Sequence, residues 1–193
     1  MDKTKTLIIL LICVLFCGVL VTMKLLGKND ADEMLKNYPQ EIQDVYKITK
    51  NVFASGMQEE KAYDYQILDD KNKCMMLFNY LNYKGWLKDE ISFDTMDIAL
   101  NSLFGNSFDY GNLLYTYEKY VYQNDGTKII RNVLTSETSY DYETKIENYH
   151  IDGNLITLDM KIDGSANNAI YRYIFEKNSD DYRLQKIYLN PTK

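Results

Sequence analysis

The feature of this sequence that most constrains its fold is a change in the spacing of apolar residues at Gly105. Before that glycine, apolar residues recur at three- and four-residue steps, which is the spacing of one face of an α-helix. After it, apolar and polar residues alternate in runs separated by Asp-Gly turns, as in half-buried β-strands. A chain with helices first and an antiparallel sheet afterwards belongs to the α+β class.

Three helices are predicted before this change. The first follows Pro39, whose missing N–H suits a helix start, and it ends before Gly56. The third is capped by the side chain of Ser92 or Asp94, and Gly105 ends it. The expected ranges are residues 40–55 and 69–83 for the first two helices, the third begins after Ser92 or Asp94 and ends before Gly105, and a short strand is expected within residues 84–91.

An antiparallel β-meander of about six strands is predicted after Gly105. Asn124-Asp125-Gly126 and Asp152-Gly153 have the composition of tight hairpin turns, and each separates two alternating runs. The expected strands cover residues 115–123, 128–134, 140–151, 154–162, 169–177 and 182–189.

An uncharged apolar run lies near the N-terminus and predicts a transmembrane helix. A helix needs about 20 residues to cross the hydrocarbon core, and this run reaches that length because Lys24 can direct its ammonium to the membrane surface. The predicted anchor residues are Leu7, Ile8, Ile9, Leu10, Leu11, Ile12, Val14, Leu15, Phe16, Val19, Leu20, Val21 and Met23.

A cleaved signal peptide and a lipoprotein are the alternatives to this anchor. A cleaved signal has an apolar core of about 7–15 residues followed by a small-x-small site, and neither feature occurs here. A lipoprotein needs a small residue before its cysteine, whereas Ile12 precedes Cys13 and Phe16 precedes Cys17. The sequence therefore favours an uncleaved signal anchor.

The domain organisation follows from this anchor. Residues 1–28 are the predicted cytoplasmic tail and transmembrane anchor, residues 29–38 a juxtamembrane spacer, and residues 39–193 one globular α+β domain. The lysines on the two sides of the span are nearly balanced, but long domains translocate largely regardless of charge. We expect a single-pass protein of the cell membrane with its C-terminal domain on the extracytoplasmic side.

The order of elements over roughly residues 40–189 resembles the cone-shaped fold of the nuclear-transport-factor and cystatin-like superfamilies. The chain as a whole also resembles uncharacterised single-pass membrane proteins of low-GC Gram-positive-type bacteria. That second resemblance is carried by the apolar run, by Leu103-Phe104-Gly105 and by the tyrosine-rich strands that follow. It implies a bacterial membrane location and no particular activity.

Charge and cysteine content limit the partners. The net charge of -6 disfavours nucleic acid, because phosphate backbones are bound by clustered Lys and Arg. The lipid bilayer is expected to be contacted only through the N-terminal helix. Of the three cysteines only Cys74 belongs to the soluble part, so an internal disulfide there is impossible.

No catalytic, cofactor or metal site is predicted from the motifs. The only histidine, His150, precedes an Asp-Gly turn and is interpreted as a solvated or edge-strand residue. Residues 148–159 imitate the spacing of a calcium loop, but His150 and Ile156 stand where oxygen ligands are needed. Cys74 lies among apolar residues and is interpreted as a buried structural thiol.

The 18 tyrosines support the leading functional hypothesis, since tyrosine is frequent where proteins bind other molecules and is also a good strand residue. We predict a non-enzymatic module that binds a protein, peptide or envelope polymer. The alternative is an enzyme or small-ligand domain with a pocket between sheet and helix, in which His150, Asp152 or a buried carboxylate would face the cavity. The predicted recognition surface consists of Tyr115, Tyr117, Tyr120, Tyr122, Tyr171 and Tyr173.

Overall fold

The computed structural model describes residues 34–106, 108–133, 143–163 and 169–191. Among these residues no helix is both long and apolar enough to cross a membrane, and the predicted anchor within residues 7–23 lies outside them. The chain divides into two compact units between Gln43 and Asp44.

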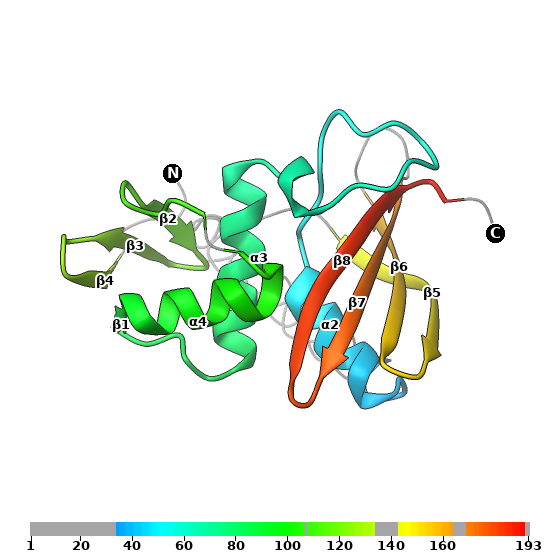
Figure 1. Ribbon diagram of the computed structural model, residues 1–193, viewed down its shortest axis with the longest axis horizontal. Coiled ribbons are helices and arrows are strands. Elements are labelled where there is room, and N and C mark those ends of the chain that lie inside the picture. The colour runs from blue at the N-terminus through cyan, green and yellow to red at the C-terminus, as the bar shows by residue number, and fades with distance from the viewer. Residues whose placement is uncertain (1–33, 107, 134–142, 164–168, 192–193) are drawn as a thin grey trace, which may run out of the picture. The chain divides into compact units, whose positions relative to one another are not determined.

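The described residues form three α-helices, one 3-10 helix and eight strands, which confirms the α+β class (Figure 1). In chain order these are α2 (Gln40–Thr49), η1 (Tyr65–Ile67), α3 (Asp70–Tyr83), β1 (Glu90–Ser92), α4 (Phe93–Phe104), β2 (Leu114–Tyr117), β3 (Tyr120–Asn124), β4 (Lys128–Val133), β5 (Glu143–Asp152), β6 (Leu155–Asp163), β7 (Ile170–Asn178) and β8 (Asp181–Leu189).

The smaller unit contains the start of α2. The carbonyl of Pro39 accepts hydrogen bonds from the backbone N–H groups of Ile42 (3.0 Å) and Gln43 (3.1 Å). The side-chain amide of Gln43 donates to the carbonyl of Tyr38 at 2.9 Å. The proline therefore stands directly before the helix, as its sequence position predicts.

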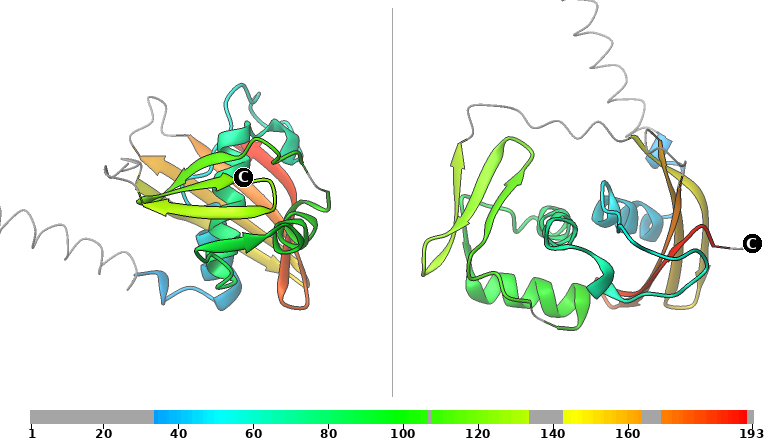
Figure 2. Two further views of the ribbon diagram at one scale, coloured as in Figure 1. Left: turned by 90° about the vertical axis from the view of Figure 1, so that its left-hand side faces the viewer. Right: turned by 90° about the horizontal axis from the view of Figure 1, so that it is seen from above.

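In the larger unit the helices lie between two antiparallel four-stranded sheets, as the right-hand view of Figure 2 makes clear. The first sheet has the strand order β1-β4-β3-β2, and the second has the order β5-β6-β7-β8. This corrects the predicted meander of about six strands in two respects. Seven strands follow Gly105 among the described residues, and together with the short strand β1 before it they form two sheets.

The added strand comes from a turn that lacks the usual turn residues. Residues 115–123 are predicted as one strand, but Tyr117 pairs with Tyr120 across a two-residue turn. Glu118 in that turn has a φ of 52°, a left-handed conformation that two-residue hairpins require and that glycine or asparagine normally supplies. Neither residue type is present, and only the adjacent charged residues Glu118 and Lys119 interrupt the alternation of tyrosines.

The start of α4 agrees with one of its two predicted caps, and α3 begins one residue after the expected position 69, which is its cap. The carboxylate of Asp69 accepts a hydrogen bond from the backbone N–H of Asn72, and the hydroxyl of Ser92 accepts one from that of Thr95. Gly105 ends α4 with a φ of 70°, where a side chain would be strained. These local signals fix both helices along the chain.

The segment after α2 runs through the interior, where its backbone needs hydrogen-bond partners. Val52 and Ala54 are 1% and 4% exposed. The hydroxyl of Tyr173 donates to the carbonyl of Val52, and that of Tyr171 donates to the carbonyl of Ala54 at 3.1 Å. Two tyrosines of β7 thereby hold this segment against the second sheet.

Two asparagines of α3 form further hydrogen bonds with the backbone of the same segment. The side-chain amide of Asn79 donates to the carbonyls of Ile48 (3.1 Å) and Lys50 (2.7 Å). The side-chain oxygen of Asn72 accepts from the backbone N–H of Phe53 at 3.1 Å. The segment is therefore bonded on one side by α3 and on the other by β7. Helix α2 ends at Thr49 instead of residue 55, and Asn51 just after it has a left-handed φ of 61°, which is typical of a helix C-terminus.

We predict that Tyr173→Phe lowers the free energy of unfolding by about 1–3 kcal/mol, because the buried carbonyl of Val52 loses its donor. The measurement is urea unfolding of the full chain in detergent, followed by the fluorescence of Trp86. Tyr65→Phe is the matched control, since Tyr65 is only half-buried, and it should change stability by less than about 0.5 kcal/mol. Equal effects of the two changes would contradict this role of Tyr173.

Candidate functional site

The predicted tyrosine surface is wrong for five of its six residues, because they lie in the interior. Only Tyr120 is half-buried. The exposed fractions of the others are 7% for Tyr115, 7% for Tyr117, 1% for Tyr122, 9% for Tyr171 and 0% for Tyr173. Residues that alternate along a strand share one face, and here the tyrosine face is turned toward the helices.

The tyrosines of the first sheet pack on one ring of α3. The centroid of Phe78 lies 5.2 Å from that of Tyr115, 5.7 Å from that of Tyr117 and 4.7 Å from that of Tyr122. The hydroxyl of Tyr117 donates to the side-chain oxygen of Asn79 at 2.9 Å. These rings form the contact between the first sheet and α3, and Tyr115 also borders a hollow at the surface.

The other candidates from the sequence are not brought together. Cys74 is buried as predicted, and burial, followed by the charge of Asp70, raises the pKa of its thiol to about 12. His150 and Asp152 are exposed on β5, so they do not face an enclosed cavity. Within the described residues, no group of three or more His, Cys, Asp or Glu side chains is placed to hold a metal ion.

A polar cluster joins α3 and α4 to the β7–β8 hairpin. The carboxylate of Asp181 accepts hydrogen bonds from Tyr80 (2.7 Å), Lys84 (2.9 Å) and Ser102 (3.4 Å). The ammonium of Lys84 also lies 5.5 Å from the ring of Trp86. Burial opposes ionisation of Asp181, but the bonds from Lys84 and Tyr80 outweigh it and lower the pKa of this carboxyl. The cluster therefore has a structural role, because it connects the two helices to the hairpin.

The second sheet protects both of its edges. The segment before η1 covers β8: the backbone N–H of Tyr63 donates to the carbonyl of Ile187 (2.9 Å), and that of Glu60 donates to the carbonyl of Leu189 (3.0 Å). At the opposite edge, β5 has a bulge at Glu147 between Ile146 and Asn148. Coverage and bulges both hinder the addition of another strand.

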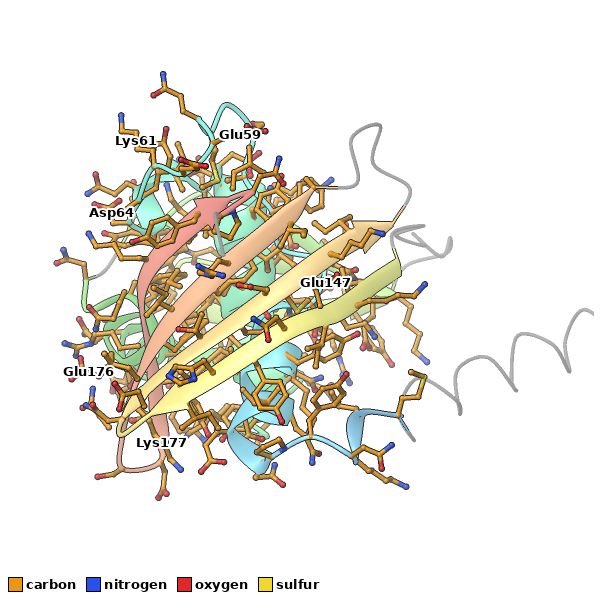
Figure 3. The ribbon with its side chains drawn as sticks, turned by 90° about the vertical axis from the view of Figure 1, so that its right-hand side faces the viewer. Glu59, Lys61, Asp64, Glu147, Glu176 and Lys177 are labelled. Atoms are coloured by element: carbon orange, nitrogen blue, oxygen red, sulfur yellow. The ribbon has the colours of Figure 1, made fainter. Side chains whose placement is uncertain are left out.

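The outer face of the second sheet, turned to the viewer in Figure 3, carries polar groups that are paired with each other. The guanidinium of Arg172 donates to both carboxylate oxygens of Asp159, at 2.7 Å and 2.8 Å. The carboxylate of Glu176, labelled in Figure 3, accepts from Asn154 (3.1 Å) and Gln185 (2.9 Å). A face whose charges are already satisfied is a weak candidate for a binding surface.

The outer strand β2 of the first sheet differs from both of those edges. It borders a hollow of ≈ 740 Å³, which we call the β2 groove. Leu114 in β2 is 73% exposed, the most exposed of the large apolar side chains described. The groove is lined by residues 112–116, by Asp70, Lys71 and Cys74 of α3, and by residues 108–110 of the preceding loop.

Within the described residues, the backbone of β2 turns groups without a strand partner toward this groove. The backbone N–H of Asn124 in β3 donates to the carbonyl of Leu113, so residue 113 faces β3. In an antiparallel pair, successive residues turn their N–H and C=O groups alternately toward and away from the partner strand. Tyr115 and Tyr117 therefore also face β3, whereas Leu114 and Thr116 direct their backbone groups to the open edge.

The loop that forms one end of the groove is held by side-chain hydrogen bonds. The carboxylate of Asp109 accepts from the backbone N–H of Gly111 at 2.7 Å. The side-chain amide of Asn124 donates to the carbonyl of Gly111 at 3.0 Å. The hydroxyl of Tyr110 donates to the carboxylate of Asp97 at 3.0 Å, which ties the loop to α4.

A second hollow, of ≈ 480 Å³, lies at the opposite edge of the first sheet. Its lining includes Trp86, Ile98 and the three residues of β1. The edge here is short, and Lys128 closes an ion pair with Glu90 at 2.9 Å. The β2 groove is the better candidate because it is larger and its strand edge is longer.

Sequence reasoning missed this groove because its walls come from segments far apart in the chain. One signal was present: Leu114 is a large apolar residue on the strand face opposite the tyrosines. On a strand with one buried face, such a residue is exposed unless something covers it.

We predict that the stabilising effect of Asp181 disappears in acid. Its pKa is lower in the folded state than its ordinary value of 3.8, so it stabilises the fold above that value and loses this effect as pH falls through its folded pKa. The difference in unfolding free energy between the native chain and Asp181→Asn should be constant above about pH 5 and shrink toward pH 3. Urea titrations at each pH measure it, and a difference independent of pH would contradict the assignment.

Comparison with known proteins adds no identification to this geometry: no family model, no curated protein and no solved structure matches the chain.

Proposed function

We propose that this chain is a membrane-tethered, non-enzymatic binding module on the extracytoplasmic side of a cell membrane, and that it binds a macromolecule at the β2 groove. The observation that carries the proposal is an open strand edge beside a hollow of ≈ 740 Å³. A volume of about 300–1,000 Å³ is typical of small-molecule pockets, and it is the strand edge beside this hollow that favours a macromolecule.

The protonation states of two side chains in the groove lining favour contact with a partner over nucleophilic or base catalysis by these two groups. Burial is the main cause that raises the pKa of Cys74 to about 12, and that of Tyr110 to about 12 with help from its bond to Asp97. Both side chains line the groove and keep their protons at neutral pH. A protonated thiol or phenol is a poor nucleophile and a poor base, but it offers apolar and polar contact area.

The tether is supported by the apolar run within residues 7–23 and by the charge of the chain. A net charge of -6 disfavours adsorption to anionic lipid headgroups, so membrane attachment needs a hydrophobic segment. The same attachment would hold the groove close to the membrane surface, where polymers and other proteins of the cell envelope are its potential partners.

We predict that the full chain stays in the membrane fraction after washes with high salt and with alkaline carbonate, because a hydrophobic span and not electrostatic attraction holds it. Protease added to intact cells should remove the globular domain. Immunoblots of the fractions measure both results. Release by carbonate would contradict the anchor, and protection from protease until lysis would put the domain in the cytosol.

We predict that a partner covers the groove in cells. A photo-crosslinking benzoylphenylalanine placed at Leu114 of the full chain should give a discrete adduct of higher mass on irradiation of intact cells. The same amino acid at Lys186, exposed on the outer face of β8, is the matched control and should give none. Absence of an adduct at Leu114, or the same adduct from both positions, would refute the proposed site.

A further inference from the structure

We infer that the β2 groove binds a basic peptide segment in extended conformation, which joins the first sheet as a fifth strand beside β2. This inference rests on the proposed function and adds the chemistry of the partner and its mode of binding. It is carried by the free backbone groups of the edge, by the alternation of the lining and by the charge of the rim.

The backbone of β2 offers the partner a row of hydrogen bonds. Leu114 and Thr116 each direct one N–H and one C=O away from β3, so an added strand can form on the order of four bonds. Consecutive residues 112–116 line the groove, which means that the hollow runs along this edge. Only an extended chain presents donors and acceptors at the matching spacing.

The length of the edge sets the size of the bound segment. The four residues of β2 span about 13 Å at roughly 3.3 Å per residue, which corresponds to about four residues of a paired peptide. Alternate peptide side chains would then point to opposite faces of the sheet. One set would lie beside Leu114 and Thr116, and the other would enter the groove beside Cys74 and Tyr115.

The inner wall of the groove favours an apolar side chain at those peptide positions whose side chains point into the groove. Cys74 and Tyr115 are each 7% exposed, and Phe108 and Leu113 complete the apolar part of the lining. A charged group placed there would lose its hydration without gaining a partner. We therefore expect an aliphatic or aromatic residue at one or two positions that alternate with outward-facing ones.

The charge of the rim selects a basic peptide. Asp70 and Asp109 line the groove together with Lys71, and the ammonium of Lys73 lies 3.5 Å from the carboxylate of Asp70. With Asp97, which is bonded to Tyr110 at the end of the groove, three carboxylates stand against two ammonium groups and leave a net charge of -1. Because the chain as a whole carries -6, an acidic segment would also be repelled during its approach.

The test uses the full chain in detergent micelles and a phage-displayed library of random eight-residue peptides. Selection should enrich peptides with Lys or Arg and with apolar residues at alternate positions. The most enriched sequence, synthesised with a fluorescent label, should bind with an affinity that falls at least about tenfold for Thr116→Pro, which removes an outward N–H but no bond to β3. Thr116→Val keeps that N–H and should bind within about twofold of the native chain.

A second measurement does not depend on the folding of the proline variant. The same peptide with N-methyl groups on alternate backbone nitrogens should lose binding to the native chain when the methylated face is the one turned to β2. Binding that tolerates both methylation patterns, or a selection that enriches acidic or unrelated sequences, would overturn strand addition of a basic peptide.

The photo-crosslinking experiment separates this inference from the function on which it rests. If the adduct at Leu114 persists unchanged in the Thr116→Pro chain, the groove is a binding site but strand addition is wrong. If the chain with benzoylphenylalanine at Leu114 and no other change gives no adduct, the proposed function itself fails. Loss of the adduct in Thr116→Pro together with its retention in Thr116→Val supports both.

Discussion

The structure depends on satisfying the backbone of one partly buried segment, residues 48–54. This segment leaves α2 and passes between α3 and the second sheet, and the backbone of its buried residues Ile48, Val52 and Ala54 needs hydrogen-bond partners from the protein. Its carbonyls receive donors from Tyr171 and Tyr173 of β7 and from Asn79 of α3. An unsatisfied buried carbonyl costs about 1–3 kcal/mol, so several of them together would match a large fraction of the stability of a domain this size. The need for these bonds fixes where α3 and β7 can lie.

The same need explains why the abundance of tyrosine is a misleading sign of a recognition surface. A phenylalanine in place of Tyr173 would fill the interior equally well but would leave a carbonyl without a donor. Tyrosine supplies a large ring and one hydroxyl at its far end, which suits a strand that must reach across to buried backbone. A single sequence reveals which residues alternate, but not which of the two faces meets a helix.

Much of the fold was nevertheless predictable, wherever the signal is local. Asp69 and Ser92 cap helices through their own side chains, Gly105 adopts a left-handed conformation, and the turns that contain Gly126 and Gly153 join strands as expected. The split of residues 115–123 was not predictable, because Glu118 takes a left-handed φ without a favourable residue type. Nor was the division into two sheets, since the pairing of β1 with β4 depends on contacts between distant parts of the chain.

The groove at β2 depends on the buried segment as well. Asp69 bonds both the backbone and the side chain of Asn72, and the side-chain oxygen of Asn72 in turn accepts from Phe53. The first turn of α3, which provides one wall of the groove, is thereby locked to the interior. On the other side, the packing of Tyr115 and Tyr117 on Phe78 holds β2 in place, while its outer edge stays unpaired within the first sheet. Two walls positioned by separate core contacts keep a hollow between them, and a preformed hollow of this kind would not have to be ordered before the proposed extended segment could bind.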